Sequence, residues 1–175
     1  VGLVNGLILR QIKGDMGASV MITFGTGTIL SALALMYTGG YSIRTDDNPL
    51  FYWYGNGKIY DLPVVVLLFF ICAVIFHIIL KYTSYGRSLY LTGANPEAAR
   101  LSGIATGRVR TAAFMLMGGI VGLAAVIVSS QAVSASPVAG TNYELDVIAA
   151  VVIGGTSLNG GEGSIFRTII GVLLI

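Results

Sequence analysis

Two acidic residues, Glu144 and Asp146, are the clearest candidates for chemistry in this sequence, because a close pair of carboxyl groups can act as acid and base. Such a pair is what the hydrolysis of a glycosidic bond requires. Both residues lie at the edge of an apolar run, however, and nothing else in the sequence supports glycoside chemistry. Acids at membrane-spanning segments are candidates for function, so a role of Glu144 and Asp146 in a gate or in helix positioning is one interpretation. The other is that both carboxylates are simply solvated at the edge of the apolar run.

The other reactive side chains are isolated along the chain. Cys72 is the single cysteine and His77 the single histidine, which leaves no Cys-based or His-based metal set. A Gly-rich stretch at 154–163 could form a phosphate nest, but it has no lysine, and no GxxxxGK[ST] loop occurs in the chain. We expect no catalytic residue, metal or bound cofactor in this chain. The stretch is expected to form a tight non-helical turn, made by Gly154, Gly155, Gly160, Gly161 and Gly163.

The composition places these residues in a membrane protein. Of 175 residues, 55% are hydrophobic and 10% charged, with a mean hydropathy of +0.83. Soluble domains carry about 25% charged residues. Three uncharged runs, at 16–43, 62–80 and 111–143, approach or exceed the roughly 20 apolar residues that cross a bilayer as a helix. The sequence therefore predicts an all-α, polytopic transmembrane helical bundle, and the small net charge of +2 gives no reason to expect nucleic-acid binding.

We expect residues 1–175 to form a single transmembrane domain that is an internal fragment of a longer protein, because the last apolar run is still open at Ile175. A long polar connection, residues 38–61, separates the first two spans, and a basic connection, 81–110, separates the second from the third. The expected spans are 17–37, 62–80, 111–133, a partial or broken span at 145–156, and a truncated span at 165–175.

The distribution of charge predicts the orientation of these spans. Short cytoplasmic loops are enriched in Lys and Arg. The connection 81–110 contains a single acidic residue, Glu97, whereas all the charged residues of 134–146 are acidic. We therefore assign 81–110 to the cytoplasm. Its basic residues are Lys81, Arg87, Arg100, Arg108 and Arg110.

Close helix packing is expected within the membrane. Glycine accounts for 24 of the 175 residues, about twice the average share of roughly 7%. Gly118 and Gly122 form a GxxxG pair in the third span, and small residues at this spacing allow two membrane helices to approach closely.

One short stretch of the basic connection, "NPEAARLSG", has the features of a capped helix. Asn95 is a good N-cap, Pro96 fits the first helical position, and Gly103 suits the left-handed residue that ends a helix. Glu97 and Arg100 are three residues apart and can pair on the exposed face. The stretch therefore predicts a rigid helix of about two turns, with Ala98, Ala99 and Leu101 available for docking.

Two longer motifs carry a specific resemblance. "YGRSLYLTGANPEAARLSGI" and "AGTNYELDVIAAVVIGGTSLNGGEGSI" resemble the two signatures of the sugar-importing ABC permeases typified by the ribose permease. The pattern departs at Thr92-Gly93-Ala94, where a Gly-Gly pair is usual, and at Asn142 and Glu162. These departures leave the identity of the sugar open.

The resemblance implies that residues 1–175 are a single permease domain with 81–110 as its coupling loop. It also implies a transport subunit of the bacterial plasma (inner) membrane, not an enzyme. It implies partners: an ATP-binding cassette subunit that carries ATP and Mg, a periplasmic or extracellular solute-binding protein, a second permease copy, a sugar and the surrounding lipid. Two alternatives stay open, a branched-chain amino-acid permease and an ion-coupled secondary transporter. The residues that the resemblance assigns to ATPase coupling are Asn95, Pro96, Glu97, Ala98, Ala99, Arg100, Leu101 and Gly103.

Overall fold

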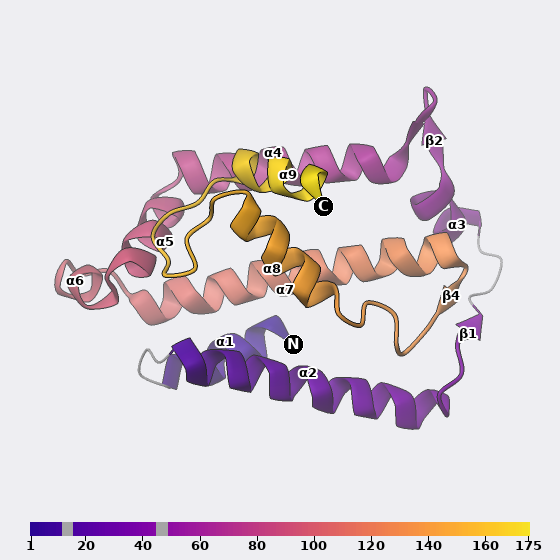
Figure 1. The fold of residues 1–175 in the computed structure, drawn as a ribbon, viewed down its shortest axis with the longest axis horizontal. Helices are drawn as coiled ribbons and strands as arrows, with labels where there is room; N and C mark the ends of the chain where they lie inside the picture. The colour runs from indigo at the N-terminus through magenta and orange to yellow at the C-terminus, as the bar shows by residue number, and fades with distance from the viewer. Residues whose placement is uncertain (12–15, 45–48) are drawn as a thin grey trace. The chain divides into compact units, whose positions relative to one another are not determined.

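The computed structural model describes residues 1–11, 16–44 and 49–175, and it is helical almost throughout (Figure 1). The all-α class predicted from the sequence is confirmed. The helices are α1 Gly2–Gln11, α2 Met16–Thr38, α3 Pro49–Asn56, α4 Val64–Tyr82, α5 Ser84–Ala94, α6 Pro96–Leu101, α7 Thr106–Ala132, α8 Tyr143–Ile153 and α9 Ile165–Leu174. Four two-residue strands, which the sequence did not predict, are β1 Ile43–Arg44, β2 Lys58–Ile59, β3 Leu62–Pro63 and β4 Ser134–Ala135.

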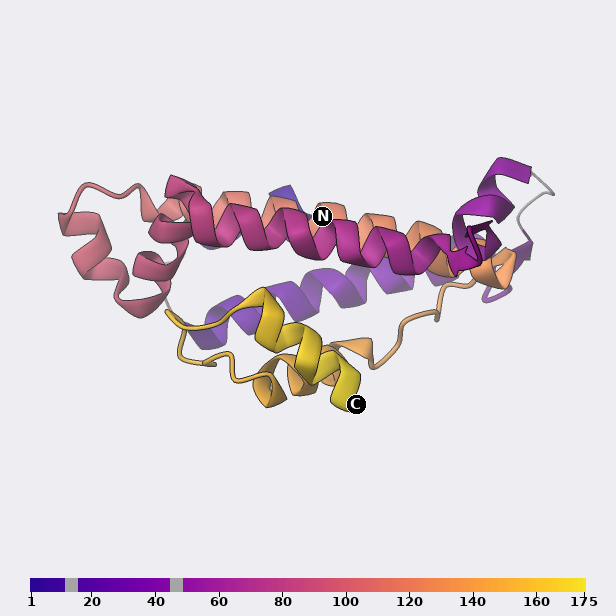
Figure 2. The ribbon, with the colours of Figure 1, turned by 90° about the horizontal axis from the view of Figure 1, so that it is seen from above.

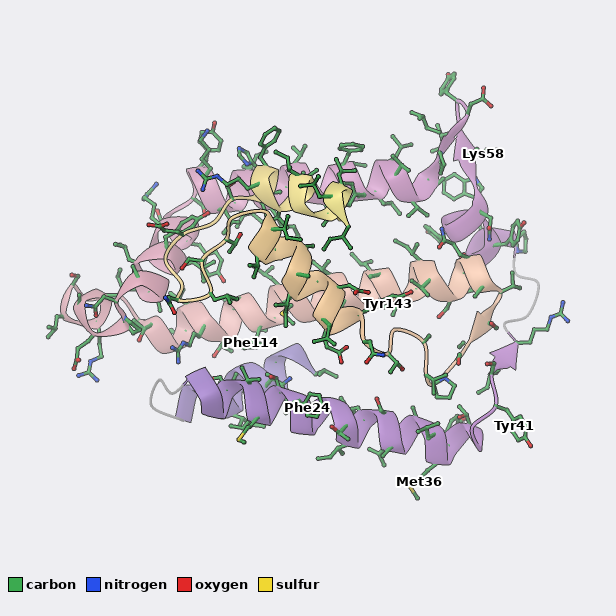
Figure 3. All side chains as sticks on the ribbon, in the orientation of Figure 1. Phe24, Met36, Tyr41, Lys58, Phe114 and Tyr143 are labelled. Carbon is green, nitrogen blue, oxygen red and sulfur yellow. The ribbon has the colours of Figure 1, made fainter. Side chains whose placement is uncertain are left out.

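Three of these helices are long and apolar enough to cross a membrane. They are Ser19–Thr38 of α2, α4 and α7, with mean hydropathies of 1.7, 2.9 and 2.3 over their most apolar windows. At 1.5 Å per residue, even the 19 residues of α4 approach the roughly 30 Å thickness of the hydrocarbon core. Apolar side chains project outward along them, as Met36 does with 82% of its surface exposed (Figure 3). Exposed apolar surface on this scale suits lipid and neighbouring helices, so the chain is a multi-pass membrane protein.

The helix bounds differ from the expected spans by more than two residues at two places, for physical reasons. Helix α7 begins at Thr106 and not at 111, because Arg108 and Arg110 are good helix formers that do not end a helix. Helix α8 ends at Ile153 and not at 156, because Gly155 takes a positive φ of 78°. The membrane topology of these segments stays a prediction.

The chain divides into two compact units, and α4 and α7 each run from one unit into the other. One unit contains residues 1–70 and 111–139, and the other contains 71–110 and 140–175. The assignment of the whole chain to a single permease domain stays a prediction.

In the first unit, α1 packs on α2 and α7. The Thr26 hydroxyl lies 2.9 Å from Asn5 Oδ1, and the Thr111 hydroxyl donates to the Gly6 carbonyl at 3.0 Å. Gly118 of the GxxxG pair lies against Gly2, where an added Cβ would stand 3.0 Å from the Gly2 Cα. Gly122 differs, since apart from its chain neighbours and the nearby backbone of α7 no described atom lies within 4 Å of its Cβ position. The close helix contact expected at Gly122 is therefore not made within the described part of the chain.

The other end of this unit is held by polar contacts to Ser130 near the end of α7. Ser130 is fully buried, its hydroxyl donates to the Phe51 carbonyl, and its own carbonyl accepts from Asn56 Nδ2 at 3.1 Å. Strand β1 pairs with β4 beyond α7, and β2 pairs with β3 in the turn before α4. These contacts join the polar connection between the first two spans to the end of the third.

In the second unit, α8 and α9 pack directly against each other. Gly171 of α9 is buried so closely on the backbone of α8, at Ala150, that no side chain fits there. Helices α5 and α6 follow α4 in the chain and lie past its Lys81 end (Figure 2). This unit contains both of the motifs that carry the resemblance.

Candidate functional site

Helix α6 is the short capped helix that the sequence predicts between two spans. The Asn95 side chain accepts hydrogen bonds from the backbone N–H groups of Glu97 at 3.1 Å and Ala98 at 3.0 Å. Pro96 occupies the start of the helix, where its missing N–H leaves nothing unsatisfied. The predicted N-cap is confirmed.

The other end of α6 is closed by a Schellman motif. Gly103 has φ of 82°, and its N–H donates to the Arg100 carbonyl at 3.0 Å. The N–H of Ile104 reaches back to the Ala99 carbonyl, also at 3.0 Å. The predicted C-terminal glycine is confirmed, and both ends of a helix of only six residues are fixed by local hydrogen bonds.

The exposed surface of α6 is narrower than the sequence suggested. Ala99 is only 4% exposed, so it packs inside the unit and supports the helix; it does not offer surface for docking. Leu101 is 82% exposed, and Glu97, Ala98 and Arg100 are also exposed. The sequence could not assign these sides, because six residues are too few for a hydrophobic period to single out one face. The role of α6 in coupling stays a prediction.

The Gly-rich turn 154–163 lies directly against the end of α5 that leads into α6. A Cβ added at Gly93 would stand 2.7 Å from the Gly161 nitrogen, and one added at Gly160 would stand 2.7 Å from the Gly93 carbonyl oxygen. Gly160 and Gly161 have positive φ angles of 87° and 79°. Only glycine combines this conformation with so close an approach of two backbones. Gly93 and Gly160 are 67 positions apart, so the two motifs are in backbone contact at the end of α5 that leads into α6.

Two tyrosines extend this contact between segments. The Tyr90 hydroxyl donates to the Gly163 carbonyl at 2.8 Å, which ties α5 to the end of the turn. The Tyr85 hydroxyl donates to the Val109 carbonyl of α7 at 3.3 Å, and burial raises the pKa of this phenol. Sequence reasoning missed both residues, since their partners lie 73 and 24 positions away. The tyrosines stand within the first motif, but nothing in their spacing identifies those partners.

Glu144 and Asp146 occupy the first turn of α8. Both side chains are exposed, and among the described residues no contact joins them into a catalytic pair. Asn142 precedes the helix with φ of 71° and makes no side-chain cap hydrogen bond. The two carboxylates therefore complement the positive end of the α8 dipole. This arrangement suits helix positioning, while a role in a gate stays a prediction.

A family model described as "Branched-chain amino acid transport system / permease component" matches residues 1–175. The chain belongs to this family. Three relatives are the ribose import permeases of Bacillus subtilis (42% identical) and Haemophilus influenzae (40%) and the L-arabinose permease of Escherichia coli (34%). The matches cover 98%, 100% and 98% of this chain but 52%, 54% and 51% of the relatives, respectively. The chain therefore spans about half the length of the curated relatives it matches.

No solved structure matches the chain. The resemblance to ribose-type permeases, stated above from two motifs, is confirmed along nearly the whole chain. The family description names branched-chain amino acids, whereas these individual relatives are named for ribose and L-arabinose. The relatives are thus the more specific comparison.

Proposed function

We propose that this chain is part of the membrane-spanning subunit of an ATP-driven ABC importer that moves a monosaccharide, ribose or a related sugar, into the cytoplasm. The observation that carries the proposal is the backbone contact between the two motifs beside α6. A capped, exposed helix that follows this contact directly in the chain is what a docking site for a separate soluble motor requires. The relatives named for ribose and L-arabinose supply the substrate class.

In this proposal, ATP hydrolysis takes place on another chain, which also holds ATP and Mg. That ATPase docks on the exposed side of α6, where Arg100 and Leu101 stand. A periplasmic or extracellular solute-binding protein delivers the sugar from the other side of the bacterial inner membrane. A second permease copy completes the transport path, as expected for a symmetric assembly of two subunits.

The alternative with independent support is a branched-chain amino-acid permease, which the family description names. The relatives at 34–42% identity favour the sugar. The ion-coupled secondary transporter has less support, since α6 would then have no motor to bind.

The test is transport by the full-length protein, reconstituted in vesicles with its ATPase and solute-binding protein. ATP-dependent uptake of labelled ribose or arabinose, but not of leucine, is the expected result. Uptake of leucine but of neither sugar would show that the transported substrate is an amino acid. Uptake driven by an ion gradient without the ATPase would overturn the proposed mechanism.

A further inference from the structure

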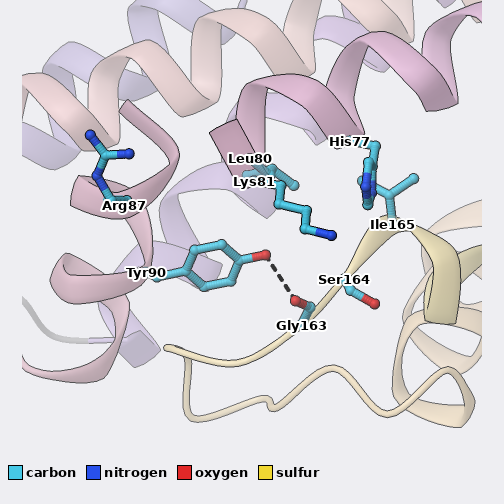
Figure 4. Close-up of a pocket in the computed structure, with 8 residues that line it drawn as sticks. All are labelled: His77, Leu80, Lys81, Arg87, Tyr90, Gly163, Ser164 and Ile165. Atoms are coloured by element: carbon cyan, nitrogen blue, oxygen red, sulfur yellow. Dashed lines mark hydrogen bonds between the residues drawn. The ribbon is translucent and has the colours of Figure 1, made fainter. Parts of the chain in front are cut away.

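The second unit contains a basic pocket of about 340 Å³ at the end of α4 (Figure 4). It is formed by the last turns of α4, by α5 and by the first residues of α9 with the turn before it. None of the roles proposed above uses this pocket. The residues that line it are His77, Leu80, Lys81, Arg87, Tyr90, Gly163, Ser164 and Ile165.

The lining carries positive charge and contains no acidic residue. Lys81 and Arg87 supply two cationic side chains, and His77 supplies an imidazole. In Figure 4 the Lys81 chain reaches from α4 toward the space beside Tyr90, Ser164 and His77. Arg87 stands on the other side of Tyr90, with one guanidinium N–H donated to the Ser84 hydroxyl at 3.0 Å, and its remaining donors suit an anion.

The start of α9 adds to this positive potential. Ser164, the N-cap, and Ile165, the first helical residue, both line the pocket. The positive end of the α9 dipole therefore borders the same space as the Lys81 side chain. Glu162 lies near the pocket in sequence, but it is exposed and outside the lining. Two cations, an imidazole and a helix N-terminus around one volume match the phosphate group of a ligand.

The position of the pocket decides between a lipid phosphate and a free one. Its α4 wall ends a helix with a mean hydropathy of 2.9, and Lys81 marks the boundary between that apolar segment and a polar connection. Beside the pocket, both helices expose apolar side chains, such as Ile78 at 49% and Phe166 at 67%. Acyl chains can lie along these surfaces while the head group occupies the pocket. Basic pockets between transmembrane helices are a known way of binding anionic lipid head groups.

We propose that this pocket binds the phosphate group of an anionic membrane phospholipid. The bound lipid bridges α4, α5 and α9, the three elements that meet there. The proposal does not depend on which substrate the protein transports.

The test is a lipid titration of the purified full-length protein, followed by native mass spectrometry. Phosphatidylglycerol is the probe, with phosphatidylcholine and inorganic phosphate as comparisons. The parent protein is expected to bind phosphatidylglycerol more tightly than phosphatidylcholine. One basic residue near a membrane surface changes such binding about fivefold, so the double variant K81Q/R87Q is expected to bind phosphatidylglycerol about thirtyfold more weakly. The charge-conserving K81R/R87K should retain the affinity.

The control is Arg108→Gln, which removes an exposed cation of the same basic connection from outside the pocket lining. Its affinity for phosphatidylglycerol should equal that of the parent. Equal binding of both phospholipids by the parent would overturn the proposal, whether or not the double variant folds. Equal losses in K81Q/R87Q and in the control would also overturn it. Full displacement of phosphatidylglycerol by inorganic phosphate would show that the pocket takes the free ion and would overturn the lipid assignment.

Discussion

Gly161→Ala tests the contact between the Gly-rich turn and the end of α5. The new methyl group would stand 2.7 Å from the Cβ of Ala94, far inside van der Waals contact, at a backbone φ of 79°. A left-handed conformation destabilises an L-residue by roughly 1–2 kcal/mol. The overlap should add about 1–3 kcal/mol, as overpacking does elsewhere. The expected loss of unfolding free energy is therefore roughly 2–5 kcal/mol.

Gly155→Ala is the matched control for this change. Gly155 lies in the same turn with φ of 78°, but the nearest atom to its Cβ position, Arg167 Cδ, is 4.0 Å away. The left-handed strain and the gain from a stiffer unfolded chain are the same in both variants, so the difference between them isolates the contact. Unfolding of the full-length protein by SDS in mixed micelles measures it. If the two variants lose equal stability, the turn does not brace α5 as described.

Three other variants test the remaining assignments. Arg100→Glu should leave expression unchanged, since a helix pair is worth only about 0.2–0.5 kcal/mol, but should weaken co-purification with the ATPase, because a reversed interface charge costs several kcal/mol. Unchanged co-purification of this variant with the ATPase would show that Arg100 is only a solvated charge. Ser102→Cys in a Cys72-free background should be labelled only from the cytoplasm. Labelling of this cysteine in intact cells by an impermeant thiol reagent would show that the assigned orientation is wrong. Gly118→Leu should lower stability in detergent, whereas Gly122→Leu should affect only assembly between subunits, and two equal melting curves would contradict this difference.

Much of the fold follows from the sequence because the deciding signals are local. Uncharged runs long enough to cross a bilayer predict α2, α4 and α7. The side-chain cap of Asn95 and the left-handed backbone of Gly103 predict the two ends of α6. Each signal depends on residues within one element or one turn. The breaks in the Gly-rich stretch follow for the same reason, since Gly155, Gly160 and Gly161 all take positive φ angles.

The candidate site could be predicted only in part, because its contacts join residues far apart in the chain. Glycine at position 93 has no side chain whose type could indicate a partner, and the hydrogen bond from Tyr90 ends on a backbone carbonyl 73 positions away. The burial of Ala99 was missed because alanine is common on both faces of a short helix. At Gly122 the sequence predicted a close helix contact that the described residues do not make. The GxxxG spacing indicates only that close packing is possible and does not identify the neighbouring helix.

The contact between the Gly-rich turn and the end of α5 explains how a helix as short as α6 could serve in coupling. Six residues cannot hold a stable helix by their own hydrogen bonds, so α6 depends on its caps and on the buried Ala99. Its N-cap, Asn95, directly follows Ala94, which contacts Gly161, and the turn continues from Gly161 into α9. A displacement of α6 by a docked partner would therefore pass through backbone contacts, which deform less than side chains, to the packed pair α8–α9. If coupling follows this path, Gly161→Ala should reduce stimulated ATP hydrolysis more than Gly155→Ala does, even at a temperature where both variants remain folded.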